Sequence, residues 1–210
     1  MANLPYNGCF YAPLLRTNCE GIVQKILDDM RKNRFSVGEA MKQQKNPLPP
    51  TAVLYRWWFP EDSKVWKVIT DYHQKHTEDT VFADFFKHIE QCTIKDKTYY
   101  ALYFGKSHRG SGRYRQHSEG SVGNSTVRHN VYGIYINDKY DEAREPEISE
   151  ILSQCYCEWV DLSNEEQWVE CFEELCIALG YYPLNVDGNP AISKAWRKVL
   201  LDARKISKKK

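Results

Sequence analysis

The segment KTYYALYFGKS, residues 97–107, constrains the fold more than any other part of the chain. Its aromatic residues are typical of a β-strand that packs in a sheet. The strand is expected to end at Gly105, where a basic loop rich in glycine and serine begins. A helix is expected next, near Gly112–Ser118. Arg113 and His117 are four residues apart, so they share one face of that helix.

Other segments supply the remaining elements. TAVLYRWWFP (51–60) is aromatic and bounded by prolines, and CYCEWVDL (155–162) is similarly apolar, so both predict strands. Apolar spacing predicts helices over residues 20–32, 62–75, 78–92, 147–154, 164–179 and 191–205, and a helical or mixed segment over 125–136. Thr77 is the expected N-cap of the helix that starts at 78, and residues 37–50 are expected to be a connector.

The charge of the chain is unevenly distributed. The net charge is only +1, but two segments are strongly basic, residues 106–128 and residues 194–210. This distribution predicts a localised binding site for a polyanion. The candidate DNA-binding residues are Lys106, Arg109, Arg113, Arg115, Arg128, Lys194, Arg197 and Lys198. Taken alone, Lys208–Lys210 indicate only a solvated tail.

The sequence YYALYFGKSHRGSGRYRQH resembles the second half of the motif that names the GIY-YIG nuclease family. In that family, a Tyr-hydrophobic-Gly element is followed by a basic residue, a loop and a helix. The helix presents an arginine and, four residues later, a tyrosine or histidine. Tyr103, Gly105, Lys106, Arg113 and His117 stand at these positions here.

The first half of the motif, a Gly-hydrophobic-Tyr element, is absent just upstream of residue 97. The strand AVLYRWW is the best match, with Tyr55 as the tyrosine and Val53 in place of the glycine. Tyr99 or Tyr100 on the later strand is an alternative for part of that role.

The third part of the resemblance lies downstream, in FEELCIALGYYPLN. The family's late segment has a helical glutamate and then, about twelve positions on, a proline and an asparagine. Pro183 and Asn185 match the last two. Glu173 and Glu174 compete for the glutamate position, and the spacing to Asn185 favours Glu173.

The resemblance spans roughly residues 51–190 and implies an α+β fold, an α/β-type sandwich. The expected sheet is small, central, mostly antiparallel and three-stranded, with helices on its flanks. A helical insertion, residues 61–92, would separate the first two strands. Residues 1–50 would form an N-terminal extension that contacts DNA or a second subunit, and residues 191–210 would form a basic helix and tail.

The resemblance also implies a metal-dependent DNA endonuclease with one ion per active site. Mg²⁺ (or Mn²⁺) suits a site in which Glu173, or alternatively Glu174, is the protein's metal ligand. Arg113 would bind the scissile phosphate, Lys106 would add a positive charge, and Asn185 would orient backbone or phosphate. The general base remains open among Tyr55, Tyr103 and His117.

The pattern is most similar to bacterial restriction-type members, which implies a type II enzyme that cuts a specific double-stranded site as a homodimer. By residue type, Lys42, Gln43, Gln44, Lys45, Asn46 and Arg109 are candidates for reading bases. One alternative is a catalytically silent module that binds nucleic acid. Another is a repair or mobile-element nuclease that acts on branched or nicked DNA.

The seven cysteines are scattered and include no Cys-x-x-Cys pair. They argue against a zinc ribbon and a disulfide framework, and favour reduced thiols in a cytoplasmic protein. With no long apolar run, no membrane association is expected, and the bacterial cytoplasm or nucleoid is the expected location.

Overall fold

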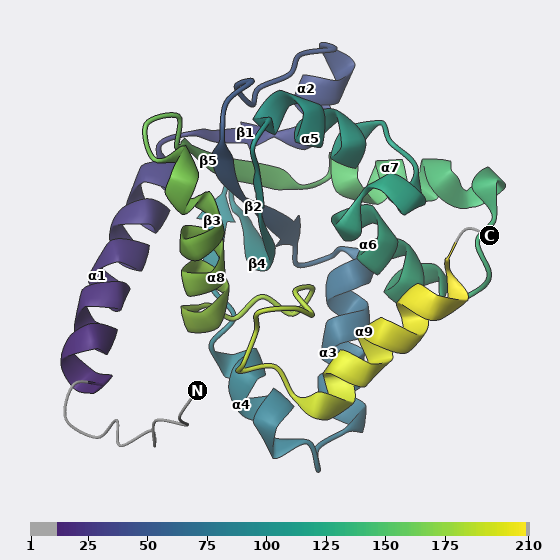
Figure 1. The fold of residues 1–210 in the computed structure, drawn as a ribbon. Coiled ribbons are helices and arrows are strands. Elements are labelled where there is room, and N and C mark those ends of the chain that lie inside the picture. The colour runs from purple at the N-terminus through teal and green to yellow at the C-terminus, as the bar shows by residue number, and fades with distance from the viewer. Residues whose placement is uncertain (1–11, 209–210) are drawn as a thin grey trace, which may run out of the picture.

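A five-stranded antiparallel sheet forms the centre of the protein, as seen in a computed structural model that describes residues 12–208 (Figure 1). The spatial order of the strands is β1-β5-β2-β4-β3. Their bounds are β1 (Arg34–Ser36), β2 (Val53–Pro60), β3 (Gln91–Ile94), β4 (Lys97–Ser107) and β5 (Tyr156–Asp161). Residues 1–11 of the predicted N-terminal extension and residues 209–210 of the predicted tail lie outside the described residues.

The α+β class and the three predicted strands are confirmed as β2, β4 and β5, but the prediction of a three-stranded sheet is wrong. Two short edge strands, β1 and β3, were missed. β1 has only three residues and no apolar alternation. β3 has exposed polar positions and pairs with β4 through a tight turn at Lys95 and Asp96, both with positive φ. Edge strands need little apolar surface, so periodicity does not reveal them.

Helices cover both faces of the sheet. The helices are α1 (Ala12–Arg31), α2 (Val37–Lys42), α3 (Lys64–Lys75), α4 (Thr80–Lys87), α5 (Gly110–Ser118), α6 (Thr126–Ile136), α7 (Glu145–Ser153), α8 (Val169–Leu179) and α9 (Lys194–Ile206), with short 3-10 turns η1 (Val122–Asn124), η2 (Glu142–Arg144) and η3 (Glu166–Trp168). α1 and α8 pack on one face, and most other helices pack on the opposite face. Within residues 12–208, none of these helices combines the length and hydropathy needed to cross a bilayer.

Strand β2 shows why the sheet is buried on both sides. Tyr55 and Trp57 belong to the core beneath α5 and α6, whereas Leu54 and Trp58 belong to the core beneath α1 and α8. All four are at most 2% exposed. The two cores together hold the central strands between two layers of helices.

Several helix boundaries differ from the sequence prediction. α1 begins at Ala12 instead of residue 20, and α8 begins at Val169 instead of residue 164. α4 begins after Asp79, whose carboxylate accepts a hydrogen bond from the Phe82 amide, so Asp79 rather than Thr77 is the N-cap. The same helix ends at Lys87 instead of continuing to residue 92. Ile89 fits the helical spacing but lies in the link to β3. The predicted connector, residues 37–50, begins with the short helix α2, whose N-cap is Ser36.

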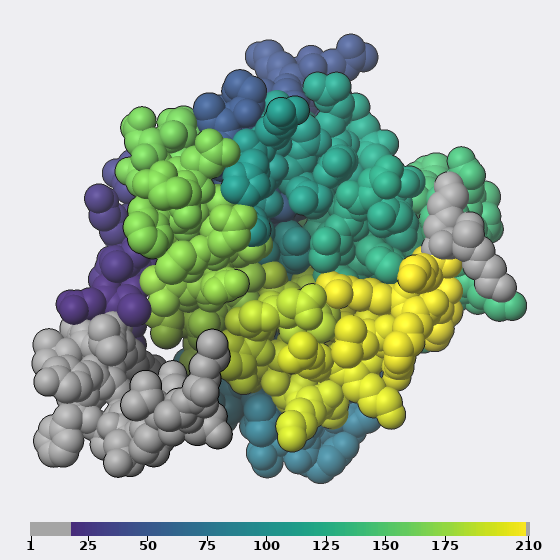
Figure 2. Space-filling view, viewed as in Figure 1, coloured from purple at the N-terminus to yellow at the C-terminus, as the bar shows by residue number. Residues whose placement is uncertain are grey.

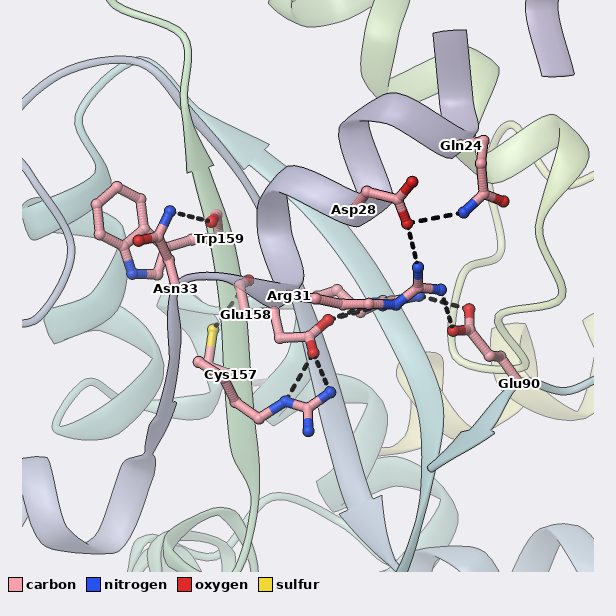
Figure 3. A network of polar contacts seen from close by, with 10 residues as sticks. Gln24, Asp28, Arg31, Asn33, Glu90, Cys157, Glu158 and Trp159 are labelled. Carbon is pink, nitrogen blue, oxygen red and sulfur yellow. Dashed lines mark hydrogen bonds and ion pairs between the residues drawn. The ribbon is translucent and has the colours of Figure 1, made fainter. Parts of the chain in front are cut away.

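A network of ion pairs lies between the sheet and α1 (Figure 3). The Arg56 guanidinium of β2 binds Glu158 of β5 at 2.7 Å and Glu90, next to β3, at 2.6 Å. Arg31 of α1 also binds Glu90, at 2.9 Å. Arg56 and Glu158 are completely buried. The network therefore links the central strands β2 and β5 to each other and to helix α1.

Candidate active site

Tyr55 of β2 lies directly opposite Gly105 of β4 in the antiparallel pair. A Cβ atom at position 105 would lie 2.8 Å from the Tyr55 hydroxyl oxygen and 2.9 Å from its Cζ atom. Only glycine therefore lets the tyrosine ring cross the neighbouring strand. Tyr55 is 2% exposed, and its hydroxyl lies inside the fold, close to Gly105 of β4.

The Tyr55 hydroxyl meets His117 of α5. Its Oη atom is 2.9 Å from Nε2 of His117, while Nδ1 of the same ring is 2.6 Å from the Ser125 hydroxyl. Burial, with added repulsion from Arg113 and Arg128, lowers the pKa of His117 well below its usual value. His117 is therefore neutral near pH 7, so one ring nitrogen carries a proton and the other accepts a hydrogen bond.

Tyr103 and Arg113 complete this part of the site. The Tyr103 ring centre is 6.4 Å from that of Tyr55 and 6.4 Å from that of His117. Burial raises the pKa of both tyrosines, and the Arg113 cation partly opposes that rise. Arg113 is half-buried on α5 and donates to Gln116 at 2.9 Å. Its charge thus acts on both tyrosines and on His117.

The alternatives Tyr99 and Tyr100 lie elsewhere. They pair with Pro60 and Phe59 at the far end of the β2–β4 ladder. Tyr100 stacks on Trp66 with ring centres 3.7 Å apart, and Tyr99 packs edge-on against Tyr156. Both have packing roles.

Val53, which replaces the glycine of the first motif half, is completely buried. The small residue needed nearby is Gly110 at the start of α5. A Cβ atom on Gly110 would lie 2.9 Å from a Val53 methyl group and 2.8 Å from the Pro49 carbonyl oxygen. The valine is thus accommodated by a glycine on the facing element.

Asn185 completes the open edge of β4. Its side-chain oxygen accepts from the Phe104 amide at 2.9 Å, and its side-chain nitrogen donates to the Phe104 carbonyl at 2.8 Å. Leu184 extends the same contact by donating its amide to Leu102 at 2.9 Å. Asn185 therefore occupies the place of a neighbouring strand and satisfies both backbone groups of Phe104, the residue after Tyr103.

Glu173 of α8 approaches the same edge. Its side chain is 21% exposed, and its carboxylate lies 3.8 Å from the Lys106 ammonium. Burial raises its pKa, which Lys106 partly offsets. Its charge acts on Tyr55 and Tyr103, whereas Glu174 is exposed. The geometry thus turns Glu173 toward the tyrosines.

A cavity of about 280 Å³ lies between Tyr103, Glu173 and Arg204 of α9. Glu174, Thr126, Asn185 and Asp187 also line it. Figure 2 shows the hollow on this face, between α8 in green, the α5–α6 segment in teal and α9 in yellow.

The family model of the GIY-YIG catalytic domain matches residues 53–206, well over half of the chain. The chain belongs to the GIY-YIG family. It is accordingly a DNA endonuclease, and nucleases of this kind generally depend on a divalent metal ion. No curated protein and no solved structure matches the chain.

The donor set fits a metal ion held in the manner of GIY-YIG nucleases. Across residues 12–208, no three histidine, cysteine or acidic side chains gather closely enough to form a metal cage. Glu173, Glu174 and Asp187 instead line a cavity that has room for water molecules, and Glu173 is the one of these three that lies beside Lys106. A single hard oxygen ligand with water around it is a coordination that Mg²⁺ accepts.

Sequence reasoning missed Glu170, which lies at the rim of this site. Glu170 accepts from Lys106 at 2.8 Å and contacts His108 at 2.8 Å. The Lys106 ammonium and His108 lower the pKa of Glu170 to about 2. Its position three residues before Glu173 places both on one face of α8, a spacing that was available in the sequence.

The predicted DNA-binding residues divide into three groups, of which the first, Lys106 and Arg113, is half-buried at the site described above. Arg109, Arg115, Lys194, Arg197 and Lys198 are exposed. Arg128 is 1% exposed, and its guanidinium binds Glu145 at 2.8 Å, the carbonyls of His117 and Ser118, and the Ser149 hydroxyl. Arg128 therefore stabilises the core, and its buried side chain offers no surface to DNA.

Proposed function

We propose that this GIY-YIG endonuclease is a type II restriction enzyme that cuts a specific double-stranded site as a homodimer with Mg²⁺. The observation that carries this proposal is a polar loop fastened beside the helix that presents Arg113. Lys42, the last residue of α2, and residues 43–46 of the loop that follows it are all exposed.

Two hydrogen bonds hold the loop to the N-terminal turn of α5. Asn46 donates to the Ser111 carbonyl at 2.7 Å, and the Ser111 amide donates to the Pro49 carbonyl at 2.8 Å. Gln44 adopts a positive φ of 51°, which turns the chain sharply here. Lysine, glutamine and asparagine side chains that suit base edges are therefore held a few residues from the proposed phosphate-binding arginine.

For catalysis, Arg113 and Lys106 would bind the scissile phosphate and stabilise charge that develops on its oxygens. Tyr55 would accept a proton from the attacking water while its own hydroxyl proton passes to Nε2 of His117. The attacking oxygen then bonds to phosphorus as the bond to the leaving sugar oxygen breaks. Tyr103 would help to position the water.

The two pKa shifts define the resting state from which this relay would start, with Tyr55 protonated and His117 neutral. A tyrosine with a raised pKa keeps its proton at neutral pH, so it needs an acceptor before it can act as a base. Neutral His117 is that acceptor when its ring proton is on Nδ1, which then donates a hydrogen bond to the Ser125 hydroxyl and leaves Nε2 to face Tyr55. Ser125 already accepts from the Arg128 amide at 3.2 Å, and its second lone pair is available to the ring.

Glu173 would hold the divalent ion, with Glu174 as the alternate ligand. When bound there, such an ion supplies positive charge to the phosphoryl oxygens and to the leaving oxygen. Asn185 would act through the backbone, because both ends of its amide already bind Phe104.

A homodimer follows from the chemistry of double-strand cleavage. One such site cuts one strand, and two sites related by a two-fold axis match a palindromic target. The exposed Lys194, Arg197 and Lys198 of α9 would add phosphate contacts at the flank.

The test is to digest a plasmid with purified protein and Mg²⁺, then sequence the ends. The proposal expects a few discrete fragments whose ends share one short symmetric sequence. Ends without a shared sequence, or nicks confined to branched substrates, would contradict restriction and favour a repair or mobile-element nuclease. DNA binding without cleavage would favour the silent module.

A further inference from the structure

Arg204 is a second arginine at the Tyr103 side of the site, and none of the family motifs accounts for it. It lies on α9 and lines the 280 Å³ cavity together with Tyr103 and Glu173. It also lines an adjoining cavity of about 190 Å³ formed by η1 and the start of α6. Thr126 also lines both cavities, so the two cavities border the same pair of residues, Thr126 and Arg204.

The charge of Arg204 is poorly compensated. Its side chain is 20% exposed, and the nearest carboxylate, that of Asp187, is 3.9 Å away and 85% exposed. The same carboxylate lies 3.6 Å from Arg197, so one solvated acid is shared by two arginines. The short side-chain contact of Arg204 is with the neutral Asn130 oxygen, at 2.5 Å.

Arg128 shows what a structural arginine looks like in this protein. Arg128 has a carboxylate at 2.8 Å and several carbonyl and hydroxyl partners within 3.4 Å. A partly buried guanidinium without such partners is costly unless a ligand supplies the anion. Burial accordingly lowers the pKa of Arg204 from its usual value.

The 190 Å³ cavity beside Arg204 suits an anion of phosphate type, because its described lining holds no acidic side chain, whereas Glu173, Glu174 and Asp187 line the 280 Å³ cavity. The N-terminal end of α6, with Thr126 in its first turn, contributes to its wall. Helix N-termini favour negative charge, and a planar guanidinium binds two phosphate oxygens at once. The Arg204 and Arg113 cations both act on Tyr103, so two arginines approach this ring.

We propose that Arg204 binds the DNA phosphate adjacent to the scissile phosphate, and so sets the register of the cut strand over Tyr103 and Glu173. The inference rests on the proposed binding of double-stranded DNA at this site. It assigns to α9 a role in the active site, beyond the flanking contacts of Lys194, Arg197 and Lys198.

The experiment compares the salt dependence of DNA binding for wild type, Arg204→Gln, Arg204→Lys and Lys205→Gln, by fluorescence anisotropy in chelator. The probe is a duplex that contains the mapped cut site, or a random 30-base-pair duplex if no DNA is cut. Lys205 is the matched control, because it is the next residue on α9, is 77% exposed and pairs with Asp202. Thermal unfolding of each variant shows whether the loss of the Asn130 contact has altered the fold.

Arg204→Gln is expected to bind less tightly and to lower the slope of log K against log salt by about one. Arg204→Lys should restore most of the slope, and Lys205→Gln should match wild type. An unchanged slope in folded Arg204→Gln would overturn the proposal. If that variant unfolds, the test uses wild-type protein and duplexes that carry one neutral methylphosphonate at a time along the cut strand. The binding affinity for each duplex shows which phosphates the protein contacts. Two adjacent sensitive phosphates support the proposal, and a lone sensitive scissile phosphate contradicts it.

This readout is independent of cleavage. A wild type that binds DNA with the expected slopes but never cuts would contradict the proposed function and leave the Arg204 contact supported. If the wild type cuts normally but Arg204→Gln leaves the salt dependence of DNA binding unchanged, the proposed function is supported and the Arg204 contact is contradicted.

Discussion

Gly105 lies opposite Tyr55 in the β2–β4 pair, and the tyrosine ring fills the space above the glycine Cα atom. The two segments that resemble the halves of the GIY-YIG motif thus meet as one cross-strand pair. This contact places the Tyr55 hydroxyl beside His117, although two helices and a strand separate β2 from β4 in sequence.

Gly105→Ala is expected to displace the Tyr55 ring and to break its hydrogen bond with His117. Overpacking of this kind costs roughly 1–3 kcal/mol of unfolding free energy, and cleavage should fall far more than stability. Urea unfolding and plasmid cleavage measure the two effects. Gly21→Ala is the control, because a Cβ there meets nothing within 4 Å, and it should leave cleavage unchanged. An active Gly105→Ala would show that the ring does not need its position.

His117 should make folding stability depend on pH. Its folded pKa is lowered by burial and by Arg113 and Arg128, whereas the unfolded chain titrates near 6.5. Below that pH the unfolded state binds the extra proton, so stability falls as pH falls. The loss is up to about 1.4 kcal/mol per pH unit for one group. Urea titrations at pH 7 and pH 5 should show a smaller decrease in His117→Gln than in wild type. Equal decreases would mean that His117 titrates normally in the folded protein.

Glu173→Gln should abolish metal-dependent cleavage, whereas Glu174→Gln should retain most of it. The two residues are neighbours on α8, but Glu173 approaches Lys106 and acts on both tyrosines while Glu174 is exposed. The measurement is the cleavage rate at increasing Mg²⁺, with circular dichroism to confirm folding. If Glu174→Gln is inactive and Glu173→Gln is active, Glu174 and not Glu173 is the metal ligand.

Glu158→Gln should destabilise the fold without touching the catalytic groups. It leaves Arg56 buried beside only one carboxylate, Glu90, and breaking a buried pair costs roughly 3–5 kcal/mol. Glu147→Gln is the control, since its pair with Arg144 lies at the surface and is worth at most about 1 kcal/mol. Chemical unfolding of both variants gives the comparison. A Glu158→Gln protein as stable as Glu147→Gln would show that the network adds no stability.

The parts of the fold that were predictable from sequence are those with strong local patterns. The aromatic runs predicted β2, β4 and β5, and the four-residue spacing correctly placed Arg113 and His117 on one helix. β1 and β3 were not predictable, because short edge strands carry little apolar signal.

Features that depend on tertiary contact could not be read in advance. Arg128 stands in a basic segment, and arginines are rarely buried, so its burial against Glu145 had no local signal. The contact of Asn185 with Phe104 depends on β4 having an open edge, which follows from the shortness of β3. Arg204 reaches the cavity only because α9 packs on α6.

The most direct test of the central claim is supercoiled plasmid cleavage by wild type and Arg113→Ala, each with Mg²⁺ and with chelator. Arg113 is the charge that acts on both tyrosines and on His117, and its half-buried position on α5 makes its removal tolerable for folding. The account predicts cleavage by wild type with Mg²⁺ alone and a loss of at least about a hundredfold in Arg113→Ala. Cleavage by wild type in chelator, or an Arg113→Ala rate equal to that of wild type, would contradict it.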